Sequence, residues 1–304
     1  MRKVAMLLCL LLAGVTGVAA EPAHFVSRSL RLDGRTYRYQ VFVPGHWTSR
    51  RQWPVVLFLH GSGERGSDNL AQLSQGLPPW LKQHAQTFPT LVVMPQASDG
   101  TAWNGKVEDF ALEALEASVR AWNGDRQRLY LTGLSMGGYG AWQIALDHPG
   151  MFAAAVVCGG IRHPNDDESL FVERIPGNVG DPYAWVAAHI GRLPTWIFNG
   201  AIDDVVPTIE SHRMHAALLA HGDDVRYTEF PGVGHGAWPL AYATNALWPW
   251  MFAHQLPKRG HRWISAGSGR LRQPPGVVSG WIGLSSTTDA SLDRSAGVIA
   301  AGAE

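Results

Sequence analysis

The sequence has little cysteine, which excludes a fold held together by disulfides. Its 304 residues include two cysteines, Cys9 and Cys158. Cys9 lies in an N-terminal segment that we expect to be removed, so the mature chain would keep Cys158 alone and could form no internal disulfide. Cys158 stands in the apolar run AAAVVCGG, a setting that favours a buried core thiol over a nucleophile.

An excess of charge of one sign is also absent. Lysine and arginine total 25 residues, and aspartate and glutamate total 25 as well. No global field therefore attracts the chain to nucleic acid or to an anionic membrane, and we expect no nucleic-acid partner. With 46% hydrophobic residues the chain can bury a sizeable core, so the composition favours a globular protein that acts on small neutral or mixed substrates.

A hydrophobic run long enough to span a membrane is lacking at the N-terminus. The chain starts with Arg2 and Lys3, continues with a short apolar run over 4–12, and has small residues before Glu21. This pattern predicts a secretory signal peptide over 1–20. A membrane anchor is the alternative, but the run is short for a span and is interrupted by polar and glycine residues. We expect a secreted protein, periplasmic or extracellular, with no stable membrane insertion after the signal is removed.

Strand and helix patterns alternate through most of the chain. The alternating runs VSRSLRL and TYRYQVFV flank a turn at 32–35 and predict an antiparallel hairpin. Later strands are nearly continuous apolar runs, typical of a parallel sheet that is covered on both faces, and the clearest helix between them is at 107–122. This order predicts the α/β class, with a mostly parallel sheet and active-site loops at the carboxyl ends of its strands. The later strands are expected at 54–60, 91–95, 128–132, 152–158, 195–199 and 225–230.

The alternation of strand and helix patterns ends at Pro257. The segment from there onward is basic, rich in glycine, serine and proline, and ends in small residues without periodicity. We predict a mostly disordered tail over 257–304, which leaves 21–256 as the catalytic domain. Five lysines and arginines between Lys258 and Arg272 could contact an anionic surface, but a solvated tail is the favoured interpretation.

The motif GLSMGG at 133–138 contains a candidate nucleophile. It fits the pattern GxSxG with Ser135 at the centre, and the predicted strand RLYL precedes it. In such a nucleophile elbow the chain turns sharply from strand to helix, and small residues relieve the crowding. The helix N-terminus then favours a developing anion. Because the chain has 34 glycines, an ordinary glycine turn is the alternative, and a base and an acid have to be found elsewhere.

Both groups follow later strands of the predicted sheet. Asp203 and Asp204 come just after the strand TWIFN, and His235 lies in a glycine-rich loop after VRYTEF. The chain order Ser, Asp, His is the one found in this type of sheet. His235 would take the Ser135 proton, and Asp203, or else Asp204, would orient the imidazole. A helix cap or an ordinary surface histidine explains each residue alone, but not their joint placement.

An oxyanion hole requires two backbone donors. The first predicted donor is the N–H of Met136, directly after the nucleophile. The second is expected in the loop HGSGERG, at 60–66, where glycines let the backbone approach a substrate. We predict the Ser62 N–H, with Gly61 as the alternative. His60 is expected to be a structural hydrogen-bonding residue rather than a second base.

Four segments together resemble a known group of enzymes. FLHGSGERGSDN, YLTGLSMGGYGAW, GAIDDVVP and YTEFPGVGHGAW are similar to motifs of secreted α/β-hydrolases of the predicted-peptidase type. That group is similar in turn to the phospholipase/carboxylesterase group and to feruloyl esterase and polyhydroxybutyrate depolymerase-like enzymes. The resemblance covers about 25–256. It implies an α/β-hydrolase fold with Ser135 as nucleophile, Asp203 as acid and His235 as base, and it implies neither a metal nor an organic cofactor.

The sequence departs from this group in two places. Asn199-Gly200 stands where relatives usually have His-Gly, which we expect to alter a supporting hydrogen bond rather than the acid. The segment at 162–192 is longer than the usual connection to the next strand. We expect it to form part of a lid or of a pocket wall, which puts transfer of the substrate by analogy in doubt.

Several side chains near the predicted site could contact a substrate. Trp103, after the strand at 91–95, and Trp238, just after the predicted base, could stack on a phenolic acyl group or a sugar. Ordinary core or rim packing is the alternative for each. Glu64, Arg65 and Asp68 could bind a polar substrate group, or could form an internal salt bridge that shapes their loop.

The favoured function is a secreted serine esterase. It would cleave carboxylic esters, either short-chain acyl, phenolic or carbohydrate-linked, as small molecules or attached to a polysaccharide. A serine peptidase of the prolyl-oligopeptidase-like type is one alternative, although the chain lacks an obvious peptide-gating domain. A non-catalytic binding module is another, although such modules tend to lose a triad member and this chain keeps all three. The fold class alone does not choose among these functions.

Overall fold

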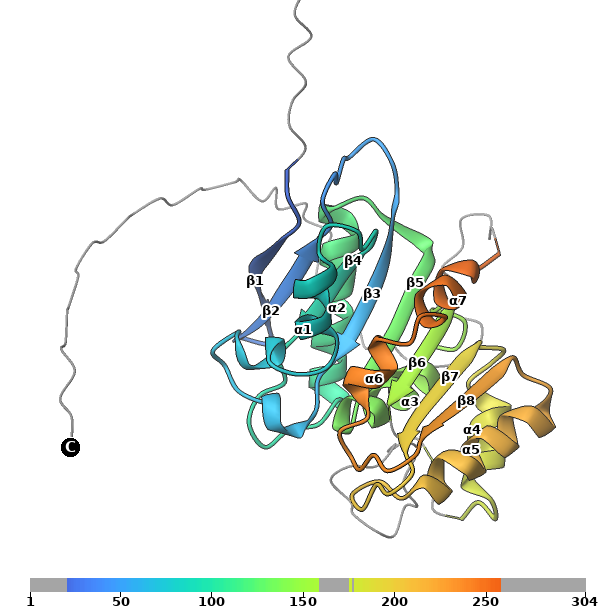
Figure 1. Ribbon diagram of the computed structural model, residues 1–304. Coiled ribbons are helices and arrows are strands. Elements are labelled where there is room, and N and C mark those ends of the chain that lie inside the picture. The colour runs from blue at the N-terminus through green and yellow to red at the C-terminus, as the bar shows by residue number, and fades with distance from the viewer. Residues whose placement is uncertain (1–20, 159–174, 177, 258–304) are drawn as a thin grey trace, which may run out of the picture. The chain divides into compact units, whose positions relative to one another are not determined.

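The computed structural model describes residues 21–158, 175–176 and 178–257 (Figure 1). The predicted signal peptide and all of the predicted tail beyond Pro257 lie outside the described residues. Part of the predicted lid segment, 162–174 and 177, lies outside them too. Within the described part of the chain, no helix is long and apolar enough to cross a membrane.

The core of the fold is an eight-stranded sheet with the strand order β1-β2-β4-β3-β5-β6-β7-β8. β1 pairs antiparallel with β2, and β2 pairs antiparallel with β4, whereas every later pairing is parallel. The predicted mostly parallel sheet with an N-terminal hairpin is therefore confirmed. The strands are β1 His24–Leu32, β2 Arg35–Val43, β3 Trp53–Leu59, β4 Leu91–Pro95, β5 Gly124–Leu134, β6 Ala154–Cys158, β7 Thr195–Gly200 and β8 Val225–Phe230.

The hairpin that opens the domain has a two-residue turn. Leu32 pairs with Arg35, so Asp33 and Gly34 alone connect the strands. Both have positive φ, 49° and 80°. Asp-Gly is a preferred sequence for such a turn, because aspartate tolerates this conformation and glycine adopts it without steric cost.

Helices cover both faces of the sheet (Figure 1). Successive residues of β3 show why, since Val55 and Leu57 belong to one buried cluster and Val56 and Phe58 to another. Side chains of α2, α3, α4 and α5 complete the first cluster, and those of α1, α6 and α7 complete the second. The helical elements are η1 Ser62–Glu64, η2 Ala71–Leu73, α1 Leu77–His84, α2 Gly105–Ala121, α3 Met136–Asp147, α4 Pro182–His189, α5 Thr208–His221, α6 Trp238–Tyr242 and α7 Leu247–Ala253.

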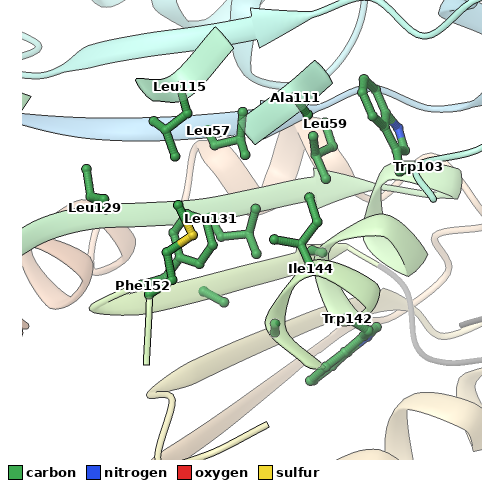
Figure 2. Close-up of a cluster of buried hydrophobic side chains, with 14 of the residues drawn as sticks. Leu57, Leu59, Trp103, Ala111, Leu115, Leu129, Leu131, Trp142, Ile144 and Phe152 are labelled. Carbon is green, nitrogen blue, oxygen red and sulfur yellow. The ribbon is translucent and has the colours of Figure 1, made fainter. Parts of the chain in front are cut away.

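Packing between the sheet and two helices fixes the position of α3, which follows the candidate nucleophile. Leu57 of β3 and Leu131 of β5 are fully buried, together with Leu115 of α2 and Ile144 of α3 (Figure 2). Apolar burial of this kind stabilises by about 1.5–3 kcal/mol for each large side chain. The start of α3 is thereby held at the carboxyl ends of β3 and β5.

The described end of the predicted lid segment is a packed helix rather than an open wall. Asp181 caps α4 by accepting hydrogen bonds from the N–H groups of Tyr183 and Ala184. Val186 of α4 is fully buried, and the Tyr183 hydroxyl donates to the Glu210 carboxylate of α5. α4 therefore belongs to the helical layer beside α5, and the lid remains a prediction for the residues outside the description.

Candidate active site

The backbone at Ser135 has the strained geometry of a nucleophile elbow. β5 ends at Leu134, α3 begins at Met136, and Ser135 between them has φ 51° and ψ −120°. Residues other than glycine rarely adopt this backbone conformation, which costs on the order of 1–3 kcal/mol. It persists because the Ser135 N–H donates to the Cys158 carbonyl at 3.1 Å, and the Ser135 carbonyl accepts from Gly138 N at 2.7 Å.

Two glycines allow the backbone to pass this closely. A Cβ on Gly133 would lie 2.0 Å from the Gly137 carbonyl oxygen, and a Cβ on Gly137 would lie 2.1 Å from the Leu59 carbonyl oxygen. Both obstacles are backbone atoms, which cannot rotate away as a side chain could. Glycine at 133 and 137 is therefore required by the packing of α3 on β3 and β5.

Ser135, His235 and Asp203 form a continuous hydrogen-bonded chain, although 100 residues separate Ser135 from His235 in the sequence. The His235 Nε2 lies 2.8 Å from the Ser135 Oγ, and the Nδ1 lies 3.0 and 3.1 Å from the two Asp203 carboxylate oxygens. A carboxylate only accepts, so the Nδ1 carries the proton and the Nε2 is left to accept from the serine hydroxyl. This arrangement can remove the hydroxyl proton as the oxygen attacks a carbonyl carbon.

The carboxylate at the end of this chain is buried and ionised. The Asp203 side chain is 3% exposed and also accepts hydrogen bonds from the N–H groups of Val205 and Val206. Burial raises the pKa of this carboxyl, but the hydrogen bonds from His235 and the two backbone groups outweigh it, so the pKa lies below its ordinary value. Asp204, the alternative acid, is exposed.

Asn199, one of the two departures from the family pattern, supports the acid loop. Its side chain is buried and donates from Nδ2 to the carbonyls of Gly200 and Val206, at 3.1 and 3.4 Å. Its Oδ1 accepts from the Ser211 hydroxyl of α5 at 2.7 Å. Asn199 thus ties the end of β7, the acid loop and α5 together, a role that the sequence indicated only as an altered hydrogen bond.

The loop after β3 lies against the nucleophile. The position that a Cβ would take on Gly61 is 3.5 Å from the Ser135 Cβ. Ser62 is the first residue of η1 and Met136 is the first residue of α3, so neither N–H has an acceptor within its own helix. Neither donates a hydrogen bond to any other group in the described part of the chain. Free donors beside a serine hydroxyl can bind an oxyanion.

His60 is a structural residue. It is 1% exposed, its Nε2 accepts from the Ala97 N–H at 3.0 Å, and its Nδ1 therefore donates to the Gly61 carbonyl at 2.6 Å. Burial lowers its pKa to about 4, so the ring is neutral near pH 7. The ring links the loop after β3 to Ala97 through these hydrogen bonds and cannot serve as a second base.

The two tryptophans predicted to contact a substrate have different positions. Trp103 belongs to the buried apolar cluster (Figure 2). It is 2% exposed, its indole N–H donates to the His60 carbonyl at 2.9 Å, and a Cβ on Gly140 would lie 2.3 Å from its Cβ. Close packing against α3 and the loop thus buries Trp103, and substrate contact by this residue stays a prediction.

Trp238, in contrast, is partly exposed beside the candidate base. Its ring meets the His235 ring edge to face, with 5.3 Å between the ring centroids. Its indole N–H donates to the Gln75 Oε1 at 3.3 Å. The contact with Gln75 joins two distant segments and had no signal in the sequence. Substrate contact by Trp238 stays a prediction.

The charged residues after β3 do not form the internal salt bridge weighed above. Asp68 accepts from the N–H groups of Leu70 and Ala71 and from the Gln96 amide, so it shapes the loop through hydrogen bonds. Glu64 is buried, its Oε2 has no hydrogen-bond partner, and burial raises the pKa of its carboxyl. In the described part of the chain, no group of three or more His, Cys, Asp or Glu side chains is arranged to hold a metal ion.

Comparison with known proteins identifies a family that matches most of the chain. The model of a family described as "Putative esterase" matches residues 29–224, well over half of the chain. A poly(3-hydroxyoctanoate) depolymerase from Pseudomonas fluorescens is 27% identical over 224 residues, which cover 66% of this chain and 74% of that protein.

Two longer relatives match only in part. A dipeptidyl aminopeptidase BIII from Pseudoxanthomonas mexicana is 26% identical over 212 residues, 60% of this chain. An uncharacterized secreted protein from Arthroderma benhamiae is 24% identical over 251 residues, 70% of this chain. The chain spans 30% and 26% of the lengths of these two proteins.

Among solved structures, a thermostable esterase superposes with a TM-score of 0.60 at 27% identity. The superposition covers 76% of this chain and 63% of that one. This similarity confirms the predicted α/β-hydrolase fold.

Proposed function

Since the chain belongs to the esterase family whose model it matches, we propose that it is a serine hydrolase that cleaves carboxylic esters with Ser135 as nucleophile. The observation that carries this proposal is the hydrogen-bonded chain from Ser135 through His235 to Asp203. A serine hydroxyl is a poor nucleophile near pH 7 unless a positioned base removes its proton. The prediction of an esterase is confirmed at the level of the family.

The proposed reaction has two halves. In the first, the Ser135 oxygen attacks the ester carbonyl carbon, His235 takes the hydroxyl proton and passes it to the leaving alcohol, and an acyl-enzyme forms. In the second, His235 takes a proton from water, the resulting hydroxide attacks the acyl carbon, and Ser135 regains its proton as the acid is released. Asp203 stays ionised throughout and stabilises the imidazolium.

Two backbone N–H groups would stabilise the oxyanion. The first is that of Met136, whose position at the start of α3 also places it at the positive end of the helix dipole. The second is that of Ser62, with Gly61 as the alternative in the same loop. Removing one such donor typically costs about 100- to 1,000-fold in kcat.

We place the reaction outside the cytoplasm, because the first twenty residues have the pattern of a signal peptide. The substrates would be short-chain acyl, phenolic or carbohydrate-linked esters, small or attached to a polysaccharide. Trp238, partly exposed beside His235, offers an aromatic edge to such groups.

A peptidase is the second candidate, favoured by the similarity to the dipeptidyl aminopeptidase. The same three side chains can cleave an amide, but an amine is a poorer leaving group than an alcohol. The chain corresponds to less than a third of that peptidase. Ester cleavage therefore remains the proposed reaction.

A matched pair of substrates tests this choice. Purified protein would be given p-nitrophenyl butyrate and the corresponding p-nitroanilide, with a stopped-flow record of the first turnover. We expect a burst of p-nitrophenol equal to the enzyme concentration, much slower anilide cleavage, and a butyryl group on the peptide that contains Ser135. Equal ester turnover by Ser135→Ala would refute the proposal, and preferential anilide cleavage would support the peptidase.

A further inference from the structure

The loop that carries the proposed oxyanion donors, residues 60–73, satisfies most of its polar side chains internally. Both ring nitrogens of His60 are hydrogen-bonded. Asp68 accepts from two backbone N–H groups and from Gln96. Asn69 donates to the Tyr39 carbonyl and accepts from the Gln72 amide, at 3.3 and 2.8 Å. Hydrogen bonds thus engage most polar side chains of the loop, although the Glu64 Oε2 and the Gln72 Oε1 have no partner.

Arg65 carries the positive charge of this loop, and its guanidinium has no strong acceptor. Its Nη2 lies 3.0 Å from the sulfur of Met136, and a thioether is only a weak acceptor. Its Nε is buried and has no hydrogen-bond partner. In the part of the chain that the structure describes, no carboxylate oxygen lies within 4.0 Å of the guanidinium. Arg65 therefore has no anionic partner of its own.

The missing partner is not explained by a lack of nearby acids. Glu64 directly precedes Arg65, but its Oε2 lies 3.1 Å from the position that a Cβ would take on Gly61, and it does not pair with the guanidinium. Asp68 follows shortly after, but its Oδ1 is engaged by the loop. Neither neighbouring carboxylate therefore pairs with Arg65, since Asp68 is engaged by the loop and the Glu64 Oε2 is buried without a partner.

A partly buried guanidinium without an anion has a free-energy cost. Arginine keeps its charge at all relevant pH values, and its planar fork matches a carboxylate. Burial of a charge is costly unless it is paired. A ligand that supplies a carboxylate removes this cost when it binds. A ligand without a carboxylate does not, so the unpaired guanidinium favours the charged ligand.

The position of Arg65 connects it to the ester that reacts. Its guanidinium touches Met136, the residue directly after Ser135, and the Met136 N–H is one of the two proposed oxyanion donors. A group held by Arg65 would therefore lie close to the scissile carbonyl. We propose that Arg65 is a specificity-determining residue, and that it binds a second, free carboxylate carried by the ester substrate. This inference rests on the proposed ester hydrolysis.

The free carboxylate could belong to the acyl part or to the alcohol part of the ester. Two pairs of esters separate these sources. Mono-p-nitrophenyl glutarate and its methyl ester differ only in a charge on the acyl side. 4-Carboxyphenyl butyrate and its methyl ester differ in a charge on the alcohol side. The quantity to measure is the ratio of kcat/KM for the charged ester to kcat/KM for its neutral partner.

We expect the wild-type protein to prefer the charged member of one pair by on the order of 10- to 100-fold, the usual strength of a hydrogen bond to a charged group. In Arg65→Met this ratio should fall to about one. Arg65→Lys keeps the charge without the fork and should keep an intermediate ratio. In the wild type the ratio should also fall as salt is raised, which no purely structural role of the side chain would cause.

Arg38→Met is the matched control. The Arg38 guanidinium donates to the Ser67 carbonyl of the same loop at 3.0 Å, so its removal perturbs the loop without removing the unpaired cation. The ratio should stay at the wild-type value in this variant.

Three results would overturn the inference. A wild-type ratio near one for both pairs would do so while leaving ester hydrolysis intact. An equal loss of charged and neutral turnover in Arg65→Met and Arg65→Lys would assign Arg65 to the oxyanion or to the loop structure instead. Absence of turnover for all four esters would refute the proposed function, and the inference with it.

Discussion

The two ends of strand β5 share an unusual backbone angle but use it differently. Asn123, just before the strand, has φ 52°, and Ser135, just after it, has φ 51°. Asn123 is a residue type that tolerates this angle, and its side chain donates to the carbonyls of Ser49 and Arg51, both at 3.0 Å. Ser135 is not a residue type that tolerates this angle, and its conformation is held by backbone hydrogen bonds to Cys158 and Gly138 and by the packing around it. A strained angle at a residue type that does not favour it therefore distinguishes the carboxyl end of β5 from the amino end.

The two ends of β5 also differ in whether the polar groups near them have partners. The amino end borders an open cavity of about 390 Å³, but the charges near it are paired with one another: Arg126 with Glu116, and Arg128 with Asp125. At the carboxyl end, the N–H groups of Ser62 and Met136 and the Arg65 Nε lack hydrogen-bond partners within the described part of the chain. Unsatisfied groups that converge on one serine therefore identify the candidate site better than cavity volume does.

The largest expected effect follows from removing the hydroxyl at the strained end. Ser135→Ala should lower ester turnover by about 10³- to 10⁶-fold. The free energy of unfolding should stay close to that of the wild type, because alanine is as strained as serine at this position. Ser135→Gly should be equally inactive but slightly more stable, since glycine adopts this φ without strain. Turnover assays and urea unfolding check both variants, and full activity of either would contradict the assignment.

The next effect separates the two neighbouring aspartates. Asp203→Asn should lower kcat by on the order of 10⁴-fold, because an amide favours the wrong tautomer of His235. Asp204→Asn is the control, and it should change kcat less than about two-fold, because this side chain is exposed. Steady-state kinetics with one ester decide the matter. A larger loss at 204 than at 203 would reverse the assignment of the acid.

A third effect tests the packing that imposes the strain. Gly137→Ala should destabilise the protein by more than about 3 kcal/mol or prevent folding, because the new Cβ would meet the Leu59 carbonyl oxygen at 2.1 Å. Gly180→Ala has open space around the new methyl group and no positive φ, so it should be tolerated. Thermal or urea unfolding compares the two, and similar stability would show that the elbow is not tightly packed.

A fourth effect concerns pH and the buried His60. The unfolded chain binds a proton at this ring as the pH falls through 6.5, whereas the folded ring stays neutral down to about pH 4. Stability is therefore fully present above pH 6.5, falls between pH 6.5 and 4, and loses roughly 3 kcal/mol over that range. Asp203, whose pKa is lowered, adds to the loss only at more acidic pH. Urea unfolding at several pH values measures this effect. Between pH 6.5 and 4 the free energy of unfolding should fall less steeply in His60→Gln than in the wild type, and an equally steep fall would contradict this account.

The smallest effect is expected at the amino end of β5. Asn123→Gly keeps the positive φ but loses the two side-chain hydrogen bonds, so we expect destabilisation of about 1 kcal/mol or less and unchanged ester turnover. If this variant lost as much activity as Ser135→Gly, the claim that only the carboxyl end of β5 serves catalysis would be wrong.

Local patterns were sufficient to predict much of the fold. The Asp33-Gly34 turn and the apolar strands follow from short-range steric and hydrophobic preferences. The structure also brings together Ser135, Asp203 and His235, because loops after parallel strands meet at one edge of the sheet. Their catalytic roles remain proposals.

Long-range side-chain contacts could not be predicted in the same way. Trp103 follows a strand like a site residue, but its ring turns into the core against Gly140. The contact of Trp238 with Gln75 spans 163 residues, and no local pattern encodes it. The direction of a side chain that leaves a loop depends on packing partners elsewhere in the chain.

The central claim is that Ser135 is an activated nucleophile held in a strained elbow. The most direct test is labelling of the purified protein with a fluorophosphonate, followed by peptide mapping, because the reagent reports an activated serine without presupposing a substrate. We predict stoichiometric labelling confined to Ser135 and abolished in His235→Ala. A folded protein that refuses the label, or that is labelled equally well at another serine, would contradict the account.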